Sequence, residues 1–318
     1  MSKVYVIHEN SVWVEPLRSA FGELGTPFEE WFLDQGVLDL RSPPPQGVFY
    51  NRMSASSHTR DHRYAAEYTG AVLAWLERHG RTIVNDSRAL RLEISKVAQY
   101  EALGAFGIPT PETLAVVGRE NIVPAAETLG YPLILKHNRG GKGLGVRLFL
   151  SRAALEEHLA SLEFEEPVDG ITLVQRYIQA PEAYITRLEF VDSRFLYAVR
   201  VDTSQGFELC PADACQVDAS AIGSAACPAV APSEKFQVIG EYENQLIPTY
   251  EQFLAANGIG IAGIEVIVDD NGKTFTYDVN TNTNYNPEAE ARAGLFGMRS
   301  IARYLDRLLS QGQAARAA

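Results

Sequence analysis

The sequence has no hydrophobic run long enough to span a bilayer, and it is short of positive charge. Its 318 residues include 28 Lys and Arg against 40 Asp and Glu, which gives a formal net charge of -12. An acidic surface is a poor partner for nucleic acids and for anionic membranes, so we expect neither as the main partner. The sequence also shows no secretory leader, and a cytoplasmic protein is expected.

Cysteine is scarce as well, with only Cys210, Cys215 and Cys227, which lie close together. Their spacing fits no zinc motif, and an odd number of cysteines without an export signal argues against a disulfide framework. The surrounding stretch is rich in Ala, Ser and Pro, which predicts a loop near the active site. A metal or redox role for the cysteines is the alternative.

Hydrophobic residues make up 46% of the chain, enough for a core in two or three lobes. The first 90 residues predict an open parallel α/β domain, because short apolar strands alternate with amphipathic helices. Strands are expected at 3–7, 28–33 and 47–53, and helices at 14–25, 62–78, 240–256 with an interruption at Pro248, and 288–309.

The stretch GIEVIVDDNGKTFTYDVN, residues 263–280, predicts two strands joined by the two-residue turn Asn271-Gly272. Asn-Gly between alternating strands is a strong hairpin signal. In the register of such a turn Asp270 faces Lys273, and counting back along both strands places Glu265 opposite Asp278.

Two carboxylates in one cross-strand pair predict a metal site. Their Cβ atoms would lie roughly 5 Å apart, and like charges at that distance destabilise a sheet unless a cation lies between them. Asn280 is on the same face as Asp278 and adds a neutral oxygen ligand. All-oxygen ligands suit Mg²⁺ or Mn²⁺. The alternative is a solvated hairpin face with two acidic residues.

A glycine-rich stretch, YPLILKHNRGGKGLGVRLFL at residues 131–150, predicts a second hairpin. Alternating apolar residues follow its glycines, whereas a dinucleotide-binding fingerprint would open a helix. Backbone N–H groups of a flexible loop around Gly141 and Gly143 can close over phosphate. Lys142 at the loop tip and Lys136 at the end of the first strand supply positive charge. The alternative is a mobile turn.

In this order, the two hairpins resemble the ATP-grasp superfamily, and within it the RimK-type carboxylate–amine ligases that include glutamate ligases. The resemblance covers residues 92–298 and begins at ISKVAQYEALGAFGIPTPET. It implies an α/β protein with α+β lobes. The expected domains are a Rossmann-like pre-ATP-grasp domain at 1–90, a central subdomain with the glycine-rich loop at 91–178, and a C-terminal subdomain with the metal site at 179–318.

The resemblance also implies roles for particular residues. Lys96 and Lys136 are similar to the family's two nucleotide-binding lysines, and Arg187 to the arginine that faces the transferred phosphate and the acyl group. The metal ligands correspond to Glu265, Asp278 and Asn280. ATP would further contact the loop residues Gly141, Lys142 and Gly143, the adenine segment Gln175, Arg176, Tyr177 and Ile178, and the ribose-binding acid Glu182.

Three departures from the family pattern stand out. Relatives often have Asp-x-Arg where this chain has Ile185-Thr186-Arg187, so the role of that aspartate is absent or moved. Arg176 replaces a glutamate that many relatives have. After Asn280 the run TNTNYNPEAE replaces a short serine and proline turn, and its Asn282 and Asn284 are candidates for substrate contact.

Basic residues also crowd the loop NRMSASSHTRDHRY, which follows the third strand of the first domain. Open α/β sheets bind ligands at the carboxyl ends of their strands, and arginine matches a carboxylate bidentately. We therefore expect a substrate carboxylate to bind Arg52 together with one or more of His58, Arg60 and Arg63. The alternative is a solvated basic loop, or one paired with the surplus acidic residues.

The resemblance implies that a carboxylate attacks the γ-phosphate of ATP, and that an amine then opens the acyl phosphate to an amide. The substrates would be a small molecule or peptide that bears a carboxylate and an amine acceptor. The resemblance is also compatible with a homodimer. A phosphotransferase that stops at phosphorylation and a protein that binds ATP without turnover are the alternatives. An oxidoreductase is disfavoured, because the glycine-rich loop enters a strand.

Overall fold

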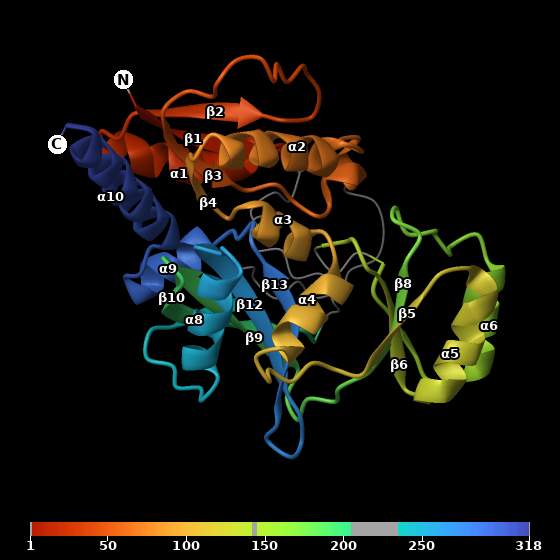
Figure 1. Cartoon of the computed structure of the whole chain (residues 1–318). Helices are drawn as coiled ribbons and strands as arrows, with labels where there is room; N and C mark the ends of the chain where they lie inside the picture. The colour runs from red at the N-terminus through yellow and green to blue at the C-terminus, as the bar shows by residue number, and fades with distance from the viewer. Residues whose placement is uncertain (1, 142–144, 205–234, 318) are drawn as a thin grey trace, which may run out of the picture.

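The computed structural model describes residues 2–141, 145–204 and 235–317, whose strands form three sheets (Figure 1). The expectations for Lys142, Gly143 and the three cysteines concern positions outside these described residues. None of the helices in the described residues is long and apolar enough to cross a membrane.

The N-terminal sheet is parallel, with strand order β2-β1-β3-β4. Its central strands β1 and β3 are buried on both faces, as parallel strands between helices usually are, whereas the edge strands β2 and β4 are partly exposed. Helix α1 and the C-terminal helix α10 pack on one face, and α2 packs on the other. The predicted open α/β domain is thus confirmed. Its elements are β1 (Lys3–His8), α1 (Ser11–Leu24), β2 (Phe28–Phe32), β3 (Gly47–Asn51), α2 (Ala65–Arg78) and β4 (Thr82–Val84), and α10 spans Gly297–Ala317.

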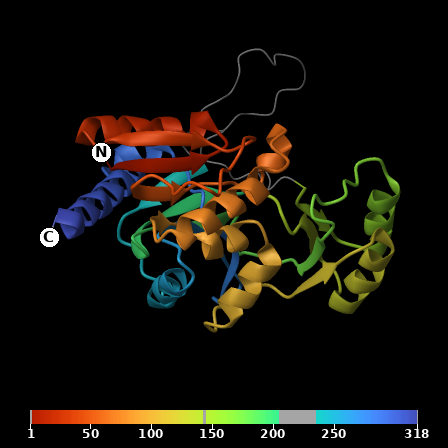
Figure 2. The ribbon, with the colours of Figure 1, turned by 45° about the horizontal axis from the view of Figure 1, so that its top comes forward.

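A small antiparallel sheet of order β5-β8-β6-β7 carries α5 and α6 on one face (Figure 1). Strands β6 and β7 pair around the glycine-rich loop, so the predicted hairpin is confirmed. In Figure 2 this lobe stands apart from the N-terminal sheet. Its elements are β5 (Thr113–Val116), α5 (Ile122–Leu129), β6 (Leu133–His137), β7 (Arg147–Phe149), α6 (Arg152–Ala160) and β8 (Thr172–Arg176).

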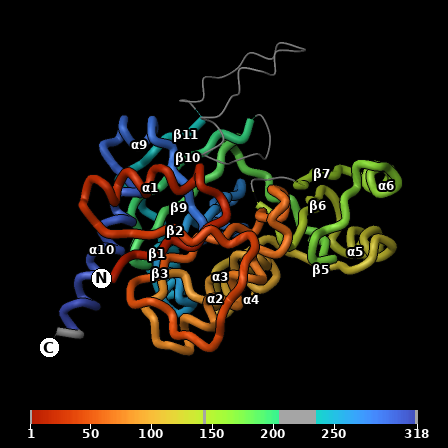
Figure 3. Tube along the Cα trace, turned by 90° about the horizontal axis from the view of Figure 1, so that it is seen from above, coloured from red at the N-terminus to blue at the C-terminus, as the bar shows by residue number. Residues whose placement is uncertain are grey.

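The large sheet is antiparallel, with order β11-β10-β9-β12-β13. Helices α3, α4 and α8 pack on one face, and the other face contacts α9 and α10. Seen from above, α9 lies at the opposite end of the molecule from α5 and α6 (Figure 3). The elements are α3 (Ser87–Glu93), α4 (Lys96–Gly104), β9 (Tyr184–Val191), β10 (Arg194–Asp202), β11 (Phe236–Ile239), α8 (Ile247–Ala256), β12 (Ile261–Val268), β13 (Thr274–Asn280) and α9 (Pro287–Ala293).

Asn85 joins the N-terminal domain to the large sheet. Its fully buried side-chain amide donates to the carbonyls of Ile261 and Thr281, at 2.9 Å each, and accepts from the N–H groups of Gly260 and Ile261. Its backbone φ of 61° lies in the left-handed region, which asparagine tolerates better than most residues. These bonds fix the loops of the N-terminal domain above the large sheet.

The hairpin of β12 and β13 differs in detail from the sequence prediction. Gly272 N–H donates to the Asp269 carbonyl at 3.0 Å, which closes a three-residue loop with Gly272 at a φ of 77°. The predicted pairing of Asp270 with Lys273 is therefore wrong. A bulge at Tyr277 then shifts the register by one residue, so Glu265 still lies opposite Asp278.

Two helix predictions also need correction. The helix expected from residue 240 begins at Ile247, and Pro248 lies in its first turn, where a missing N–H costs nothing. The single helix expected at 288–309 is two helices, because Gly294 ends α9 in a left-handed conformation and α10 begins at Gly297.

Candidate active site

A cavity of about 540 Å³ lies where the N-terminal domain, the small sheet and the large sheet meet. This volume falls within the range of small-molecule sites. The N-terminal domain contributes Trp13 and residues 54–56, and the small sheet contributes Lys136 and Gln175. Strands β9, β12 and β13 supply the charged floor, which includes Arg187, Glu265, Asp278 and Asn280.

The predicted metal ligands lie together on this floor. Glu265 and Asp278 are cross-strand partners, and Asn280 Nδ2 donates to Glu265 Oε1 at 3.3 Å, which leaves Asn280 Oδ1 to face a cation. Burial and the neighbouring Asp278 raise the pKa of Glu265 to about 7. A divalent cation would relieve this unfavourable concentration of negative charge.

The donor set is two carboxylates and one amide. No group of three His, Cys, Asp or Glu residues with the geometry of a metal site occurs in the described residues. The oxygen chemistry of Glu265, Asp278 and Asn280 nevertheless fits Mg²⁺ or Mn²⁺, both of which accept amide oxygens as ligands.

Two buried lysines lie beside these acids. Lys96 Nζ is 2.8 Å from Asp278 Oδ1 and 3.4 Å from the Gly140 carbonyl, so the start of α4, the glycine-rich loop and β13 meet at one ammonium group. Lys136 Nζ donates to Tyr100 Oη at 2.7 Å. Burial and then the charge on Lys96 lower the pKa of Lys136 to about 7. Both lysines thus line the cavity beside its acidic floor.

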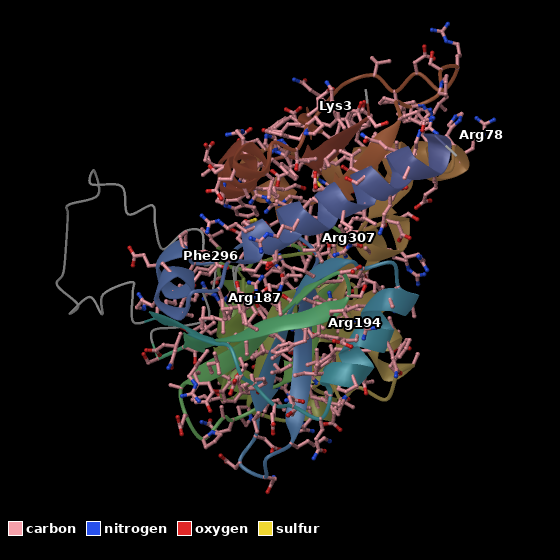
Figure 4. The ribbon with its side chains drawn as sticks, turned by 90° about the vertical axis from the view of Figure 1, so that its left-hand side faces the viewer. Lys3, Arg78, Arg187, Arg194, Phe296 and Arg307 are labelled. Atoms are coloured by element: carbon pink, nitrogen blue, oxygen red, sulfur yellow. The ribbon has the colours of Figure 1, made fainter. Side chains whose placement is uncertain are left out.

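Arg187 extends from β9 over the neighbouring strand β12. Its Nε lies 2.6 Å from Glu189 Oε1, its Nη2 donates to Thr283 Oγ1 at 2.5 Å, and its Nη1 is 3.7 Å from Glu265 Oε1. A side chain at Gly263 would collide with this guanidinium, since an added Cβ would lie 2.5 Å from Nε. In Figure 4 Arg187 lies on the side of the large sheet nearer to α10.

The segment between β8 and β9 lines the cavity with most of the predicted adenine and ribose contacts. Gln175 is buried, and its Nε2 donates to Thr113 Oγ1 at 2.7 Å and to Tyr100 Oη at 3.1 Å. Arg176 is exposed and bonds to Glu112 and to the Leu129 carbonyl. Tyr177, Ile178 and Glu182 also line the cavity, as do Gly140 and Gly141 of the glycine-rich loop.

The basic loop does not form the single anion clamp that the sequence suggested. Arg52 is buried and donates to the protein, Arg60 is paired with Glu9 at 2.6 Å, and the exposed Arg63 bonds to Glu67 and the Val168 carbonyl. His58 lines a second cavity, next to the glycine-rich loop. The four residues are thus separated, and Arg52 does not itself line the main cavity but bonds to Asn282, Asn284 and Trp13, which do.

Three buried groups of the site were missed in the sequence. Glu189 holds Arg187, and its position two residues further on the same strand face was a usable signal. Glu93 accepts from the N–H groups of Ala55 and Thr281 at 3.1 and 2.7 Å. Trp13 reaches the cavity from α1. The partners of Glu93 and Trp13 are too distant in the sequence for any local pattern to reveal them.

Two known proteins are similar to this chain in sequence over part of their length. The Marinomonas D-alanine–D-alanine ligase is 32% identical over 124 residues, which are 38% of either chain. The mouse N-acetylaspartylglutamate synthase A is 30% identical over 174 residues, 51% of this chain and 44% of that protein. The chain thus spans less than half the length of these two relatives. No family model matches the sequence.

The decisive likeness is to a solved structure, a RimK-domain ATP-grasp protein from Sphaerobacter thermophilus. It superposes with a TM-score of 0.64 over 95% of this chain and 99% of the other, at 20% identity. The chain has the ATP-grasp fold. The fold implied by the resemblance of the two hairpins is confirmed, and the cavity lies between the two antiparallel sheets, with the N-terminal domain beside it.

Proposed function

We propose that this ATP-grasp protein is an ATP-dependent carboxylate–amine ligase. The observation that carries the proposal is the convergence of Glu265, Asp278 and Asn280 with Lys96, Lys136 and Arg187 on one cavity. An oxygen-ligand set, two ammonium groups and a guanidinium together match a site that transfers a phosphoryl group to a carboxylate. The sequence similarity to two carboxylate–amine ligases supports it.

In the proposed reaction, a carboxylate oxygen attacks the γ-phosphorus of ATP, and the bond to the β-phosphate oxygen breaks to release ADP. The nitrogen of an amine then attacks the acyl carbon, the bond from that carbon to the phosphate oxygen breaks, and the nitrogen loses a proton. Mg²⁺ or Mn²⁺ held by Glu265, Asp278 and Asn280 would neutralise phosphate charge.

The protein side chains would mainly position the nucleotide and the substrates and neutralise the charge on the phosphates. Lys96 and Lys136 would bind phosphate oxygens, and Arg187 would face the charge that develops on the transferred group. The segment from Gln175 to Ile178 and Glu182 would hold the nucleoside. Gly141, Lys142 and Gly143 are proposed to cover the phosphates. No side-chain nucleophile is required.

The substrates are proposed as an amino acid or peptide with a carboxylate, together with an amine, as the names of the two relatives suggest. Asn282 and Asn284 are the proposed substrate contacts in the cavity. His58, Arg60 and Arg63 would contact only a substrate that extends beyond it. Consumption of ATP fits the predicted cytoplasmic location, and a homodimer remains a prediction.

The direct test separates ATP, ADP and AMP after incubation with Mg²⁺ and pooled amino acids and dipeptides, with mass spectrometry of the same mixture. ADP release that needs an acid and an amine, with a product one water lighter than their sum, is expected. AMP would overturn the mechanism. ADP release without an amine would favour the phosphotransferase, and ATP binding without turnover would favour the non-catalytic alternative.

A matched pair of variants tests the acidic floor. Asp278→Asn should reduce turnover on the order of a hundredfold or more. The substitution removes the negative charge of a side chain that is both a proposed metal ligand and the partner of Lys96. Asp270→Asn makes the same charge change at the exposed tip of the same hairpin and should have no effect. Near wild-type turnover of Asp278→Asn in a folded protein would contradict the assignment.

A further inference from the structure

The segment that follows β13 alternates between two environments. Thr281 and Thr283 are buried, and their hydroxyls donate to Glu93 and Glu189 at 3.0 and 2.8 Å. Asn282 and Asn284 point to the other side and line the cavity. The threonines thus anchor a segment whose asparagines line the cavity.

Arg52 lies beneath both asparagines and is 2% exposed. Its Nη2 donates to Asn284 Oδ1 at 2.9 Å and to Asn282 Oδ1 at 3.1 Å, and its Nε also reaches Asn282 Oδ1 at 3.2 Å. The remaining bonds go to the carbonyls of Trp13 and Thr283 at 3.0 and 3.2 Å. Arg52 is therefore bound entirely by neutral oxygens.

This contact fixes the orientation of both side-chain amides. A guanidinium has N–H donors and no acceptor, so each amide must turn its oxygen toward Arg52 and its NH₂ group away from it. In the described residues, neither Asn282 Nδ2 nor Asn284 Nδ2 donates a hydrogen bond to another protein group. Two N–H donors at the cavity are thus available to a ligand that offers acceptor oxygens.

The charge balance around Arg52 indicates that the acceptor oxygens of this ligand are anionic. Within residues 2–141, 145–204 and 235–317, no ion pair joins Arg52 to a carboxylate. A buried guanidinium without a counter-ion is costly, and an anion in the cavity would compensate it through the two polarised amides. Burial also lowers the pKa of Arg52.

We propose that Asn282 and Asn284 form a subsite for a substrate carboxylate other than the reacting one, with Arg52 as the positioning residue beneath them. The inference rests on the proposed ligase function. In the described residues, the side chains of Asn282 and Asn284 bond to Arg52 and to none of the proposed metal ligands or phosphate-binding lysines. They are thus placed for a different carboxylate from the one that meets the γ-phosphate. The additional carboxylate belongs to the acid, as in a dicarboxylic acid, or to an amino acid that acts as the amine.

Asn284→Asp is a sharp test, because it is nearly isosteric. The new carboxylate still accepts from Arg52, but it replaces the N–H donor with an acceptor and places negative charge at the subsite. Asn286→Asp is the matched control: Asn286 is outside the cavity lining and accepts from Ala289 N–H at the start of α9, which aspartate can also do.

The first readout is thermal unfolding, which does not depend on turnover. Asn284→Asp should not lower the melting temperature, since Arg52 gains a counter-ion. Succinate should raise the melting temperature of the wild type and of Asn286→Asp but not of Asn284→Asp, and the neutral succinamide should raise none of them. An absence of any succinate effect on the wild type, or an equal effect on all three proteins, would overturn the proposal.

The second readout is ADP release with paired substrates. A dicarboxylic acid is compared with its monoamide, and an amino acid amine with its amino acid amide, which shows which substrate carries the recognised carboxylate. Asn284→Asp should raise the KM for that substrate about tenfold or more while the KM for ATP is unchanged. Equal use of both members of each pair would overturn the subsite but leave the ligase function standing. A succinate effect without ADP release from any pair would support the subsite and contradict the ligase.

Discussion

Glu189 holds the guanidinium of Arg187 from two residues further along β9, with 2.6 Å between Oε1 and Nε. Thr283 donates to the other oxygen of Glu189 at 2.8 Å, so this buried acid is fixed from two sides. The ATP-grasp resemblance implies an aspartate two residues before the arginine, where this chain has Ile185. Positions two before and two after Arg187 share its strand face, so Glu189 can hold the guanidinium as an acid at position 185 would.

We expect Glu189→Gln to reduce kcat about tenfold to a hundredfold while the KM for ATP changes little, because Arg187 would lose its orientation. The double variant Ile185→Asp/Glu189→Gln restores an acid on the same strand face and should recover part of the loss. Steady-state kinetics of the two variants measures both effects.

Glu251→Gln is the control for this pair of variants, since Glu251 bonds to the exposed Arg194 of the same sheet at 2.5 Å. Figure 4 shows Arg194 away from Arg187. Its kinetics should match the wild type. Wild-type kcat in Glu189→Gln, or no recovery in the double variant together with normal unfolding, would contradict this role of Glu189.

Gly263 provides the space into which Arg187 extends. An added Cβ would lie 2.5 Å from Nε and 2.6 Å from Nη2 of Arg187. Because the obstructed atoms are the end of a long side chain, Gly263→Ala should displace the guanidinium without unfolding the sheet. We expect kcat to fall about tenfold or more with the melting temperature nearly unchanged.

Gly104→Ala is the matched control, because nothing lies within 4 Å of the Cβ that would be added there. Kinetics and thermal unfolding of both variants distinguish displacement of Arg187 from distortion of the backbone as the cause of lost activity. A large drop in melting temperature for Gly263→Ala would mean that the backbone, rather than Arg187, yields to the new methyl group.

The sequence predicted those parts of the site that depend on local patterns. The alternation in the hairpin placed Glu265 opposite Asp278, although two features, the three-residue loop and the bulge at Tyr277, had to cancel for the register to be right. The burial of Arg52 was beyond the sequence, because its partners Asn282 and Asn284 are 230 and 232 residues away. Such a contact depends on how the domains pack, and no periodicity records it.

Lys136 should take up a proton when nucleotide binds. Burial, with the charge of Lys96 as a further cause, lowers its pKa to about 7, so at pH 8.5 it is mostly neutral in the ligand-free protein. Phosphate oxygens beside Nζ favour the charged form and raise this pKa again. Binding of Mg·ADP at pH 8.5 should therefore take up about one proton. At pH 6 Lys136 is already charged and takes up none, and binding should instead release a proton, because the carboxyl of Glu265, whose pKa is raised to about 7, must deprotonate to hold the cation.

Calorimetry in buffers of different ionisation enthalpy measures this uptake directly. The nucleotide contributes little at pH 8.5, since the last phosphate pKa is about 6. Lys136→Arg keeps a positive charge that does not titrate in this range, so it should bind Mg·ADP without proton uptake. Equal uptake by the wild type and Lys136→Arg at pH 8.5 would assign the proton to another group. Absence of uptake by the wild type would mean that Lys136 is already charged before the nucleotide arrives, and that the carboxylates of Asp278 and Glu265 outweigh its burial.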